Sequence, residues 1–390
     1  MHYVDRDLTD KFLRVSEIYP MVALVGPRQA GKTTFLKHIM VGKKASYVLF
    51  DDPDARSIFD EDVKKFRIQY LEGYELGILD EVQYCKNAGM KLKYLVDTGE
   101  RLWITSSSEI ILQKDVLSYL VGRVSIMRLY PFDLNEFLRA KNQKSFTDDI
   151  LRRMVWEHMV YGGYPKVVLT DDTEMKRIIL RDLHETMLLK DVVRSFSIDD
   201  IGALEKLVKY LAVSGGPVSL SNLSQMLDLS FQTIKKYMDA LVKSYFIVQV
   251  KPYFTNKTKE ITKQPKIYFM DTGLRNTISG IFPSQPTGEL FENYVLSEIL
   301  KCGIVPKYWR TKSGAEVDFV IETSNELIPV EVKLSAESLK IERGFRSFIE
   351  KYKPKKGYIV TYRGERCKVK INHCEVMFVN VKDFREKLSC

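Results

Sequence analysis

The sequence predicts an α/β fold in which a parallel sheet is covered on both faces by helices and is followed by further units. Apolar runs of strand length alternate with segments of helical periodicity, which is typical of such a sheet. These runs are 21–25, 45–50, 76–79, 101–108 and 124–129. A leading helix is expected at 7–19, and a helix at 35–40 follows the pattern G-x-x-x-x-G-K-[ST] that begins at Gly26. We therefore expect a phosphate-binding loop at the carboxyl ends of the strands.

Length and charge set bounds on the class of protein. The chain has 390 residues, 45% of them hydrophobic, which suffices for two or three domains. Its formal net charge of +9 favours a polyanionic partner such as nucleic acid, although many proteins reach this charge without one. No apolar run approaches the roughly 20 residues of a membrane span, and the first ten residues are charged and polar. Five cysteines without a C-x-x-C pair favour a reducing, cytoplasmic location.

The phosphate loop predicts how a triphosphate is held. Its glycines let the backbone wrap closely around the anion, and the following helix presents unpaired amide groups to the same charge. We expect Lys32 to reach the β- and γ-phosphates of ATP and the Thr33 hydroxyl to hold Mg²⁺. The expected nucleotide-binding residues of the loop are Gly26, Pro27, Arg28, Gln29, Ala30, Gly31, Lys32, Thr33 and Thr34.

Polar residues at the ends of later runs predict the rest of an ATPase site. Asp80, after the run at 76–79, is expected to hold Mg²⁺ through water beside the nucleotide. Glu81 is expected to orient and deprotonate the attacking water. Ser107 lies at the tip of the run at 101–108, where a hydroxyl would contact the γ-phosphate. Arg123 is either an arginine finger that reaches a neighbour's nucleotide or an ordinary surface arginine.

The middle of the chain predicts helices followed by a hairpin. Helices at 150–161 and 173–194 are interpreted as a lid beside the ATPase core. Helices at 201–212, 218–227 and 231–245, with strands at 247–250 and 266–269, fit a winged helix-turn-helix. Its expected DNA-binding residues are Gln232, Thr233, Lys235 and Lys236, with the basic wing segment 251–259 on phosphates. Such units also serve only to pack against protein, and that alternative stays open.

The last part of the chain carries a D…E-x-K pattern. Strands are expected at 305–310, 315–322 and 326–333, after a helix at 288–300. Glu331 and Lys333 are two residues apart and therefore project from one face of a strand. Asp318 and Glu331, completed by Glu292, would bind Mg²⁺, and Lys333 would position or activate water for phosphodiester cleavage. This arrangement is typical of the restriction-endonuclease-like fold, although a chance set of charges, or a site that only binds DNA, would look the same.

The sequence resembles the AAA-type P-loop ATPases of archaea and bacteria whose C-terminal region is called a domain of unknown function. The resemblance covers nearly the whole chain and is carried by GPRQAGKTT, LGILDEVQ, WITSSSEIIL, LVGRV, LYPFDLNEFL, YGGYPKVV, KIYFMDTGLRN and EVDFVIE…IPVEVKLS. It implies an AAA-type core, ATP hydrolysis and a homo-oligomer. Where the family has Thr-Gly-Ser at the strand tip, Ser106 replaces the glycine, which leaves Ser106 and Ser107 as candidates for the phosphate contact.

These observations predict four parts: a P-loop ATPase core at 1–141, a helical lid at 142–200, a winged helix at 201–285 and a nuclease-like α/β domain at 286–390. We expect a protein that binds and hydrolyses ATP with Mg²⁺, binds DNA, and either cleaves or remodels it. The alternative is a nucleotide-dependent signalling switch whose C-terminal domains bind protein partners and have no nuclease activity.

Overall fold

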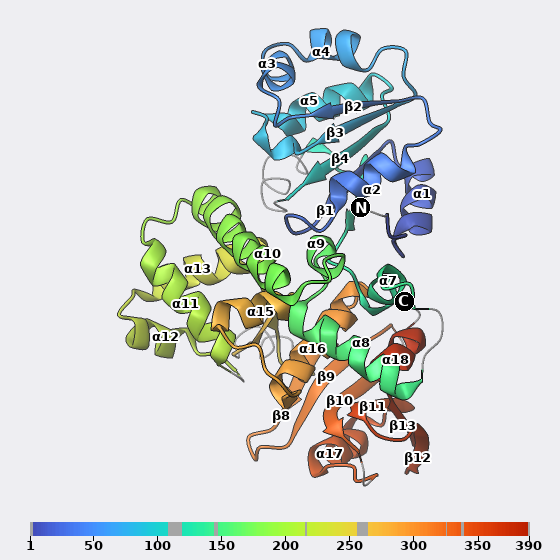
Figure 1. Cartoon of the computed structure of the whole chain (residues 1–390), viewed down its shortest axis with the longest axis vertical. Helices are drawn as coiled ribbons and strands as arrows, with labels where there is room; N and C mark the ends of the chain where they lie inside the picture. Colours follow the sequence, from blue (N-terminus) through green and yellow to red (C-terminus); the bar gives the residue numbers. More distant parts are fainter. Residues whose placement is uncertain are drawn as a thin grey trace.

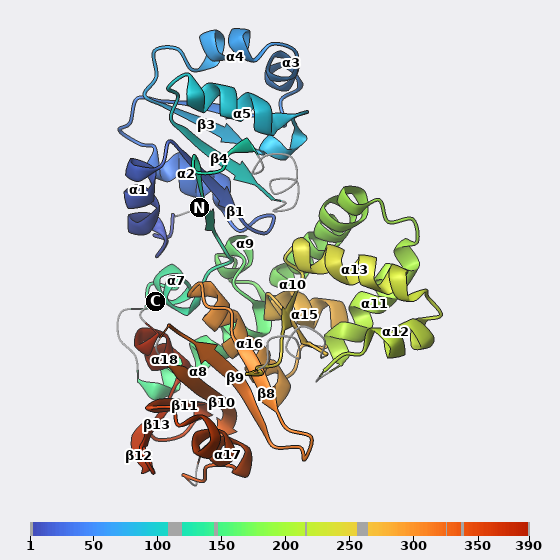
Figure 2. The same cartoon turned by 180° about the vertical axis from the view of Figure 1, so that it is seen from behind.

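The computed structural model describes residues 3–107, 119–143, 147–214, 217–255, 264–324, 326–336 and 339–388. Figure 1 shows three bodies: an N-terminal sheet with its helices, a mainly helical middle unit, and a C-terminal sheet with its helices. The view from behind in Figure 2 shows the same separation, with α9 and α16 near the junction. We call them the N-terminal unit (α1 to β5), the middle unit (α10 to α15) and the C-terminal unit (α16 to α18).

The N-terminal unit is built on the parallel sheet that the sequence predicts. Its strand order is β2-β3-β4-β1-β5, and every pairing is parallel. Its elements are α1 (Thr9–Ile18), β1 (Met21–Val25), α2 (Lys32–Ile39), β2 (Ala45–Leu49), α3 (Pro53–Glu61), α4 (Val63–Tyr70), β3 (Leu76–Asp80), η1 (Val82–Tyr84), α5 (Ala88–Asp97), β4 (Leu102–Ser106) and β5 (Val124–Arg128). This arrangement confirms the predicted α/β fold class.

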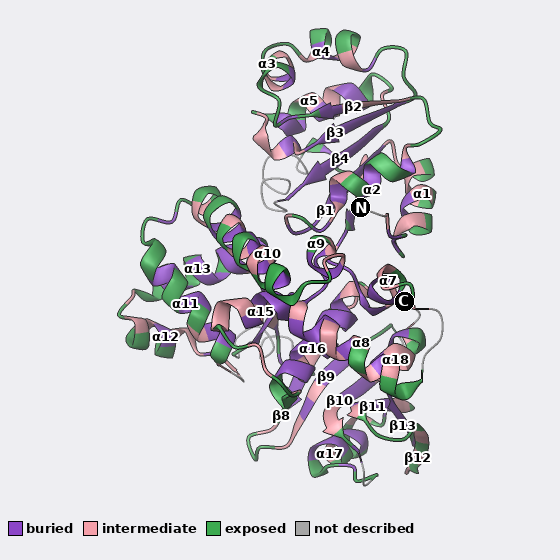
Figure 3. Cartoon of the chain, in the orientation of Figure 1, coloured by how far each residue is buried: buried purple, intermediate pink, exposed green. Residues whose placement is uncertain are grey.

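The three central strands, β1, β3 and β4, are buried on both faces, which explains why they are mainly apolar, whereas the edge strands β2 and β5 are only partly buried. Along β1, Met21, Ala23 and Val25 join one hydrophobic cluster, and Val22 and Leu24 join another. The first cluster includes side chains of α3, α4 and α5, and the second includes side chains of α1 and α2. Figure 3 accordingly shows β1, β3 and β4 as buried.

The helices of the predicted lid at 142–200 divide between two cores, and the role of this segment as a lid stays a prediction. Leu151, Val155 and Met159 of α8 belong to the core of the C-terminal unit, whereas Leu180 and Leu183 of α10 belong to the core of the middle unit. The two apolar faces therefore serve two different cores and neither covers the ATPase sheet. The elements here are α7 (Leu134–Ala140), α8 (Asp148–Tyr161), α9 (Pro165–Val168), α10 (Thr173–Thr186) and the π-helix η4 (Met187–Arg194). The expected single helix at 173–194 thus changes its winding for its last eight residues.

The middle unit has the predicted order of helices and strands. It contains α11 (Ile201–Val213), α12 (Leu220–Leu227), α13 (Phe231–Lys243), β6 (Ile247–Val250), β7 (Lys266–Phe269) and α15 (Thr272–Ser279). Strands β6 and β7 pair in antiparallel fashion. Ser219 and Ser230 cap α12 and α13 by accepting backbone hydrogen bonds, which fixes where each helix begins.

The C-terminal unit is a six-stranded mixed sheet of order β12-β13-β11-β10-β9-β8. Strands β8, β9 and β10 are antiparallel neighbours, whereas β10 and β13 each pair with β11 in parallel. The elements are α16 (Gly288–Lys301), β8 (Lys307–Arg310), β9 (Glu316–Glu322), β10 (Leu327–Ser335), α17 (Arg343–Tyr352), β11 (Lys356–Arg363), β12 (Cys367–Ile371), β13 (Cys374–Val379) and α18 (Val381–Lys387).

The middle and C-terminal units are joined through backbone hydrogen bonds. The amide of Tyr308, in edge strand β8, donates to the carbonyl of Lys251 over 3.0 Å, and the amide of Tyr253 donates back to the carbonyl of Tyr308 over 2.5 Å. The segment after β6 therefore extends the edge of the C-terminal sheet. Within the described ranges, no helix combines the length and apolar character that crossing a bilayer requires.

Candidate nucleotide site and carboxylate centre

The loop between β1 and α2 has the shape that the sequence pattern predicts. Gly26 has a φ of +150°, and a Cβ there would lie 2.1 Å from the carbonyl oxygen of Leu129. Gly31 has a φ of +96° and begins α2. The Lys32 ammonium donates to the carbonyl oxygens of Gly26, at 2.9 Å, and Pro27, at 3.0 Å. Burial lowers the pKa of Lys32, whose side chain is enclosed by the loop.

Asp80 lies opposite this loop and is fully buried. Its carboxylate accepts hydrogen bonds from the hydroxyls of Thr33, at 2.7 Å, and Tyr47, at 2.5 Å, and also from Thr105. The structure therefore brings together Thr33 and Asp80, which the sequence assigns to one Mg²⁺ site. The sequence did not predict Tyr47 or Thr105 as site residues. Thr105 belongs to the run of hydroxyl residues at the end of β4, which was the available signal.

Glu81 follows Asp80 in a left-handed backbone conformation, with a φ of 63°. Its amide donates to the Thr105 hydroxyl over 2.9 Å, and its carboxylate accepts a hydrogen bond from the Gln83 side chain. Gln83 also donates to the Ser107 hydroxyl over 3.1 Å. Glu81 and Ser107 are thus linked through one amide side chain. Ser107 is thereby connected to Glu81, and Ser106 stays the other candidate for the phosphate contact.

Two other residues of the phosphate loop, Arg28 and Ala30, form hydrogen bonds with Asp191 of η4 and with Arg6, respectively. The guanidinium of Arg28 forms a two-pronged ion pair with Asp191 of η4, with contacts of 2.8 Å and 3.0 Å. Asp191 lies 163 residues away in the chain, and its carbonyl accepts from the Ser244 hydroxyl over 2.8 Å. Arg6 donates to the carbonyl oxygen of Ala30 over 2.9 Å. Gln29 has a positive φ, and Thr34 is exposed on the first turn of α2.

Arg123 lies outside its own nucleotide site. Its carbonyl accepts from the amide of Met21, at the amino end of β1, whereas the phosphate loop follows the carboxyl end. Its side chain pairs with Asp97 at 2.7 Å, and both side chains are well exposed. Arg123 therefore lies at the end of β1 opposite to the phosphate loop of its own chain, and its role as an arginine finger toward a neighbour stays a prediction.

In the C-terminal unit, the three predicted metal ligands form what we call the carboxylate centre: Glu292 of α16, Asp318 of β9 and Glu331 of β10. Asp318 accepts from the amide of Val332 over 2.8 Å, which ties β9 to β10 at this point. Burial, followed by the charge of Glu292, raises the pKa of Asp318 to about 7. Burial, followed by the charge of Asp318, raises the pKa of Glu331 to about 9. The acids therefore interact strongly.

The residue types of this centre suit a divalent cation, but among the described residues the ligand oxygens of its three acids do not all lie within 4.8 Å of one another. Carboxylate oxygens are the ligands that Mg²⁺ prefers. Oε2 of Glu331 is buried and has no hydrogen-bond partner within the described part of the chain. A buried carboxylate oxygen without a partner is costly, and a bound cation would satisfy it. Lys333 is the predicted catalytic lysine. Its ammonium forms an ion pair with Glu342, just before α17, and lies 3.9 Å from Oε1 of Glu331.

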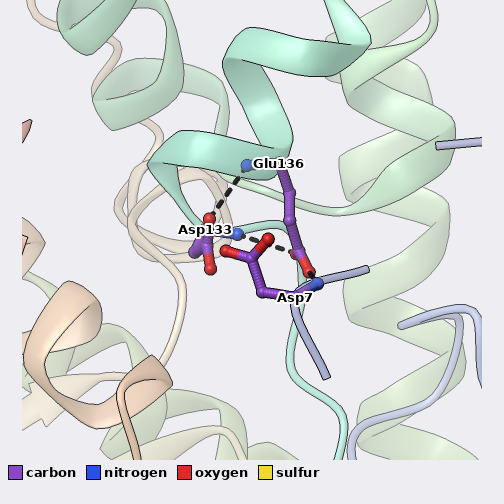
Figure 4. Close-up of side chains that lie close together, drawn as sticks. All are labelled: Asp7, Asp133 and Glu136. Atoms are coloured by element: carbon purple, nitrogen blue, oxygen red, sulfur yellow. Dashed lines mark hydrogen bonds between the residues drawn. The ribbon is translucent and has the colours of Figure 1, made fainter. Parts of the chain in front are cut away.

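A second group of acids, Asp7, Asp133 and Glu136, has ligand oxygens within 4.8 Å of one another (Figure 4). Figure 4 shows that Asp133 and Glu136 accept from each other's backbone amides at the start of α7. Each acid also pairs with an arginine: Arg139 for Asp7, Arg385 for Asp133 and Arg6 for Glu136. The group is thus a satisfied ion-pair network at a junction between units, and we assign no metal to it.

The four predicted DNA-binding residues lie on the first two turns of α13. Gln232 and Lys235 are exposed. The hydroxyl of Thr233 is 2.8 Å from that of the capping residue Ser230, and the Lys236 ammonium donates to the carbonyl of Ser197 over 2.6 Å. Two of the four therefore have structural partners. Lys257 and Lys259 of the predicted wing lie outside the described residues.

Comparison with known proteins places three matches along the chain. Residues 19–138 match an AAA domain, residues 152–285 match a domain of unknown function (DUF8612), and residues 287–381 match another (DUF4143). An uncharacterized protein of Haemophilus influenzae is 28% identical over 65% of this chain and 64% of its own length, so the match spans less than two thirds of that relative. An uncharacterized protein of Methanocaldococcus jannaschii is 28% identical over 84% of this chain and 77% of its own length.

Solved structures give weaker likenesses. A Walker-type ATPase of Pyrococcus abyssi is 15% identical, with a TM-score of 0.48, over 71% of this chain and 96% of that chain. The ORC2 protein of Aeropyrum pernix is 12% identical, with a TM-score of 0.35, over 69% of this chain and 90% of that chain. From its domain matches, the chain carries an AAA-type P-loop ATPase domain and a C-terminal DUF4143 domain, and it has relatives in bacteria and archaea.

Proposed function

We propose that the chain binds ATP with Mg²⁺ at the phosphate loop and hydrolyses it with Glu81 as the base. The contact between the hydroxyl of Thr33 and the carboxylate of Asp80 carries this proposal, because it joins the two halves of the site across a 2.7 Å hydrogen bond. Charge that develops on the phosphates would be neutralised by bound Mg²⁺, held by Thr33 and, through water, by Asp80.

In this mechanism the residues around the nucleotide exchange their present partners for substrate. Lys32 would leave the carbonyl oxygens of Gly26 and Pro27 and donate to the β- and γ-phosphates. Glu81 would accept a proton from the attacking water as that water bonds to the γ-phosphorus and the bond to the β-phosphate oxygen breaks. Ser107, which Gln83 links to Glu81, would contact the γ-phosphate.

Binding of a fluorescent ATP analogue tests the phosphate loop. Lys32→Ala should abolish binding, because it removes the cation from the phosphate cradle. Lys64→Ala on α4 is the matched control, since Lys64 is an exposed lysine of the same unit and its substitution should leave affinity unchanged. Wild-type affinity in Lys32→Ala would refute the assignment.

We further propose that the middle unit is a winged helix that binds DNA. The order α11, α12, α13, β6 and β7 supports this reading, as do the exposed Gln232 and Lys235 at the start of α13 and the net charge of +9. A mobility-shift assay at two salt concentrations tests it. Affinity should fall steeply with salt, and Lys235→Ala should weaken binding and reduce the salt dependence.

A second candidate function is a signalling switch in which the middle unit packs only against protein. The hydrogen bonds of Thr233 and Lys236 within the unit favour it, because they occupy polar groups that contacts with DNA would use, while the Lys236 side chain stays exposed. This alternative predicts ATP turnover that DNA does not stimulate and no salt-dependent DNA affinity. The same mobility-shift assay separates the two.

For the C-terminal unit we propose a restriction-endonuclease-like fold with Mg²⁺-dependent phosphodiester cleavage at the carboxylate centre. The unpartnered oxygen of Glu331 beside Asp318 supports it. Water would bond to phosphorus as the bond to the leaving sugar oxygen breaks, with Lys333 released from Glu342 to orient that water. End-labelled DNA with Mg²⁺ or Mn²⁺ should be cut by the wild type but not by Asp318→Asn, whose ATPase rate should be unchanged. DNA left intact by the wild type would refute cleavage.

We also propose a homo-oligomer in which Arg123 reaches a neighbour's nucleotide. The exposed position of Arg123, away from its own site, supports this reading. Light scattering with ATP should show particles larger than one chain, and Arg123→Ala should slow turnover without weakening ATP binding. A monomer with wild-type turnover in Arg123→Ala would refute it.

A further inference from the structure

A lysine from the middle unit is buried against the carboxylate centre of the C-terminal unit. Lys266, the first residue of β7, is 5% exposed. Its ammonium is 3.2 Å from Oε1 of Glu292 and 2.5 Å from Oε1 of Glu316. Tyr268, two residues along the same strand and therefore on the same face, donates from its hydroxyl to Oε1 of Glu292 over 2.5 Å. Oε1 of Glu292 thus has two partners from β7.

The charge of Lys266 acts on two of the three acids of the centre, Glu292 and Asp318. Burial disfavours an ammonium, but the charges of Glu292 and Asp318 outweigh that cost and raise the pKa of Lys266. In turn, Lys266 lowers the pKa of Asp318 against the effects of burial and of Glu292. Lys266 therefore supplies positive charge at the place where a divalent cation would supply it.

The position of Lys266 is fixed by contacts on both sides of β7. The side-chain amide of Asn293 donates to the carbonyl of Phe269 over 2.7 Å, and its oxygen accepts from the Phe269 amide over 3.1 Å. The hydroxyl of Tyr308 donates to the carbonyl of Gln264 over 2.7 Å. The lysine is thus held by the docking of the two units, and its withdrawal requires a movement of β7 or of its own side chain.

Lys266 also lines a cavity of about 240 Å³ between the two units, together with Glu292, Glu316, Arg275 and Arg310. Of the three acids of the centre, the lining of this cavity includes Glu292. The three oxygens of the carboxylate centre do not come as close to one another as those of the Asp7 group, which is the set within 4.8 Å among the described residues. The carboxylate of Glu292 contacts Lys266 and Tyr268 of β7 and does not join Asp318 and Glu331 in one compact ligand set.

We propose that Lys266 is a built-in competitor of the divalent cation for Glu292, so that the centre gains its full ligand set only when the lysine withdraws. The inference rests on the proposed metal-dependent function and adds its regulation: the docking of the middle unit sets how tightly the centre binds metal. The carboxylate centre is then shared between two units, with its ligands on one and its competing cation on the other.

Binding of Mn²⁺ to the full chain without nucleotide, followed by electron paramagnetic resonance, tests this inference. Lys266→Met should bind Mn²⁺ at least about tenfold more tightly than the wild type, because one positive charge beside a divalent ion is removed. Lys266→Arg should stay close to the wild type. Lys356→Met is the matched control, because Lys356 also pairs with a glutamate in the C-terminal unit, Glu326, at 3.0 Å.

The outcomes separate this inference from the proposed function. Equal or weaker Mn²⁺ affinity in Lys266→Met, with binding that still depends on Asp318, overturns the competitor and leaves the metal site standing. Mn²⁺ binding that Asp318→Asn does not change overturns both. If Lys266→Met unfolds without metal because its acids are uncompensated, refolding by Mn²⁺ supports the inference, and failure of Mn²⁺ to restore the fold overturns it.

Discussion

The ion pair between Arg28 in the phosphate loop and Asp191 in η4 connects the nucleotide site to the middle unit. Its side chains are 19% and 7% exposed, and two of its contacts are 3.0 Å or shorter. Removal of one partner from a buried pair costs about 3–5 kcal/mol. Because Arg28 retains some solvent contact, we expect Asp191→Ala to cost about 2–3 kcal/mol, the range of a strong charged hydrogen bond.

Thermal unfolding without nucleotide measures this coupling. At about 2–4 °C per kcal/mol for a domain of this size, Arg28→Ala and Asp191→Ala should each lower Tm by about 4–12 °C. The double variant should fall no further than the worse single variant, because both changes break the same pair. Arg123→Ala is the matched control: its pair with Asp97 is 38% and 42% exposed, so the loss should stay within about 1 kcal/mol.

Additive effects of the two substitutions would refute the reasoning. They would mean that Arg28 and Asp191 contribute to stability independently, and that their contact does not join the two units in solution. A drop in Arg123→Ala as large as that in Asp191→Ala would also contradict it, because burial would then not decide the strength of the pair.

Three further predictions concern the loop and the junctions. Gly26→Ala should abolish binding of an ATP analogue, because the added Cβ would lie 2.1 Å from the carbonyl oxygen of Leu129. Gly42→Ala is the control and should keep binding, because Gly42 also has a positive φ but has open space around it. Binding that survives in Gly26→Ala and is lost in Gly42→Ala would contradict this. Arg385→Ala should cost about 3–5 kcal/mol, seen in urea unfolding, because it leaves the buried carboxylate of Asp133 without its cation and leaves Glu298 with Lys301 alone; a change below 1 kcal/mol would count against it. Burial holds the pKa of His158 well below its ordinary value, so the unfolded chain takes up a proton that the folded chain does not. Stability should therefore fall by about 1.4 kcal/mol per pH unit below about pH 6.5, and a flat profile between pH 7.5 and 5.5, identical in His158→Gln, would refute this.

Local pattern was sufficient for the N-terminal sheet. Each of its central strands is a short, mainly apolar run, and a parallel sheet buried on both faces requires such runs. The loop and the Asp80–Glu81 pair follow two of these runs directly, so chain position alone indicated that Thr33 and Asp80 would meet. The strand spacing of Glu331 and Lys333 likewise indicated a shared face before the sheet was known.

The sequence pattern did not predict which residues of different units contact one another. The apolar stripe of α8 predicts that the helix is buried but does not say which core it joins, so the sequence did not show that α8 and α10 pack in different cores. Asp191 and Lys266 each look like solvated charges in the sequence. Their partners, Arg28 and Glu292, belong to other units, and only the folded chain brings them together.

The most direct test of the ATPase site compares binding and turnover in Glu81→Gln. We predict that this variant binds ATP within about threefold of the wild type, because the phosphate loop is intact, and loses at least about a hundredfold in turnover, because the base is gone. Glu75→Gln, an exposed glutamate just before β3, should match the wild type in both. Hydrolysis by Glu81→Gln at the wild-type rate would contradict the proposed mechanism.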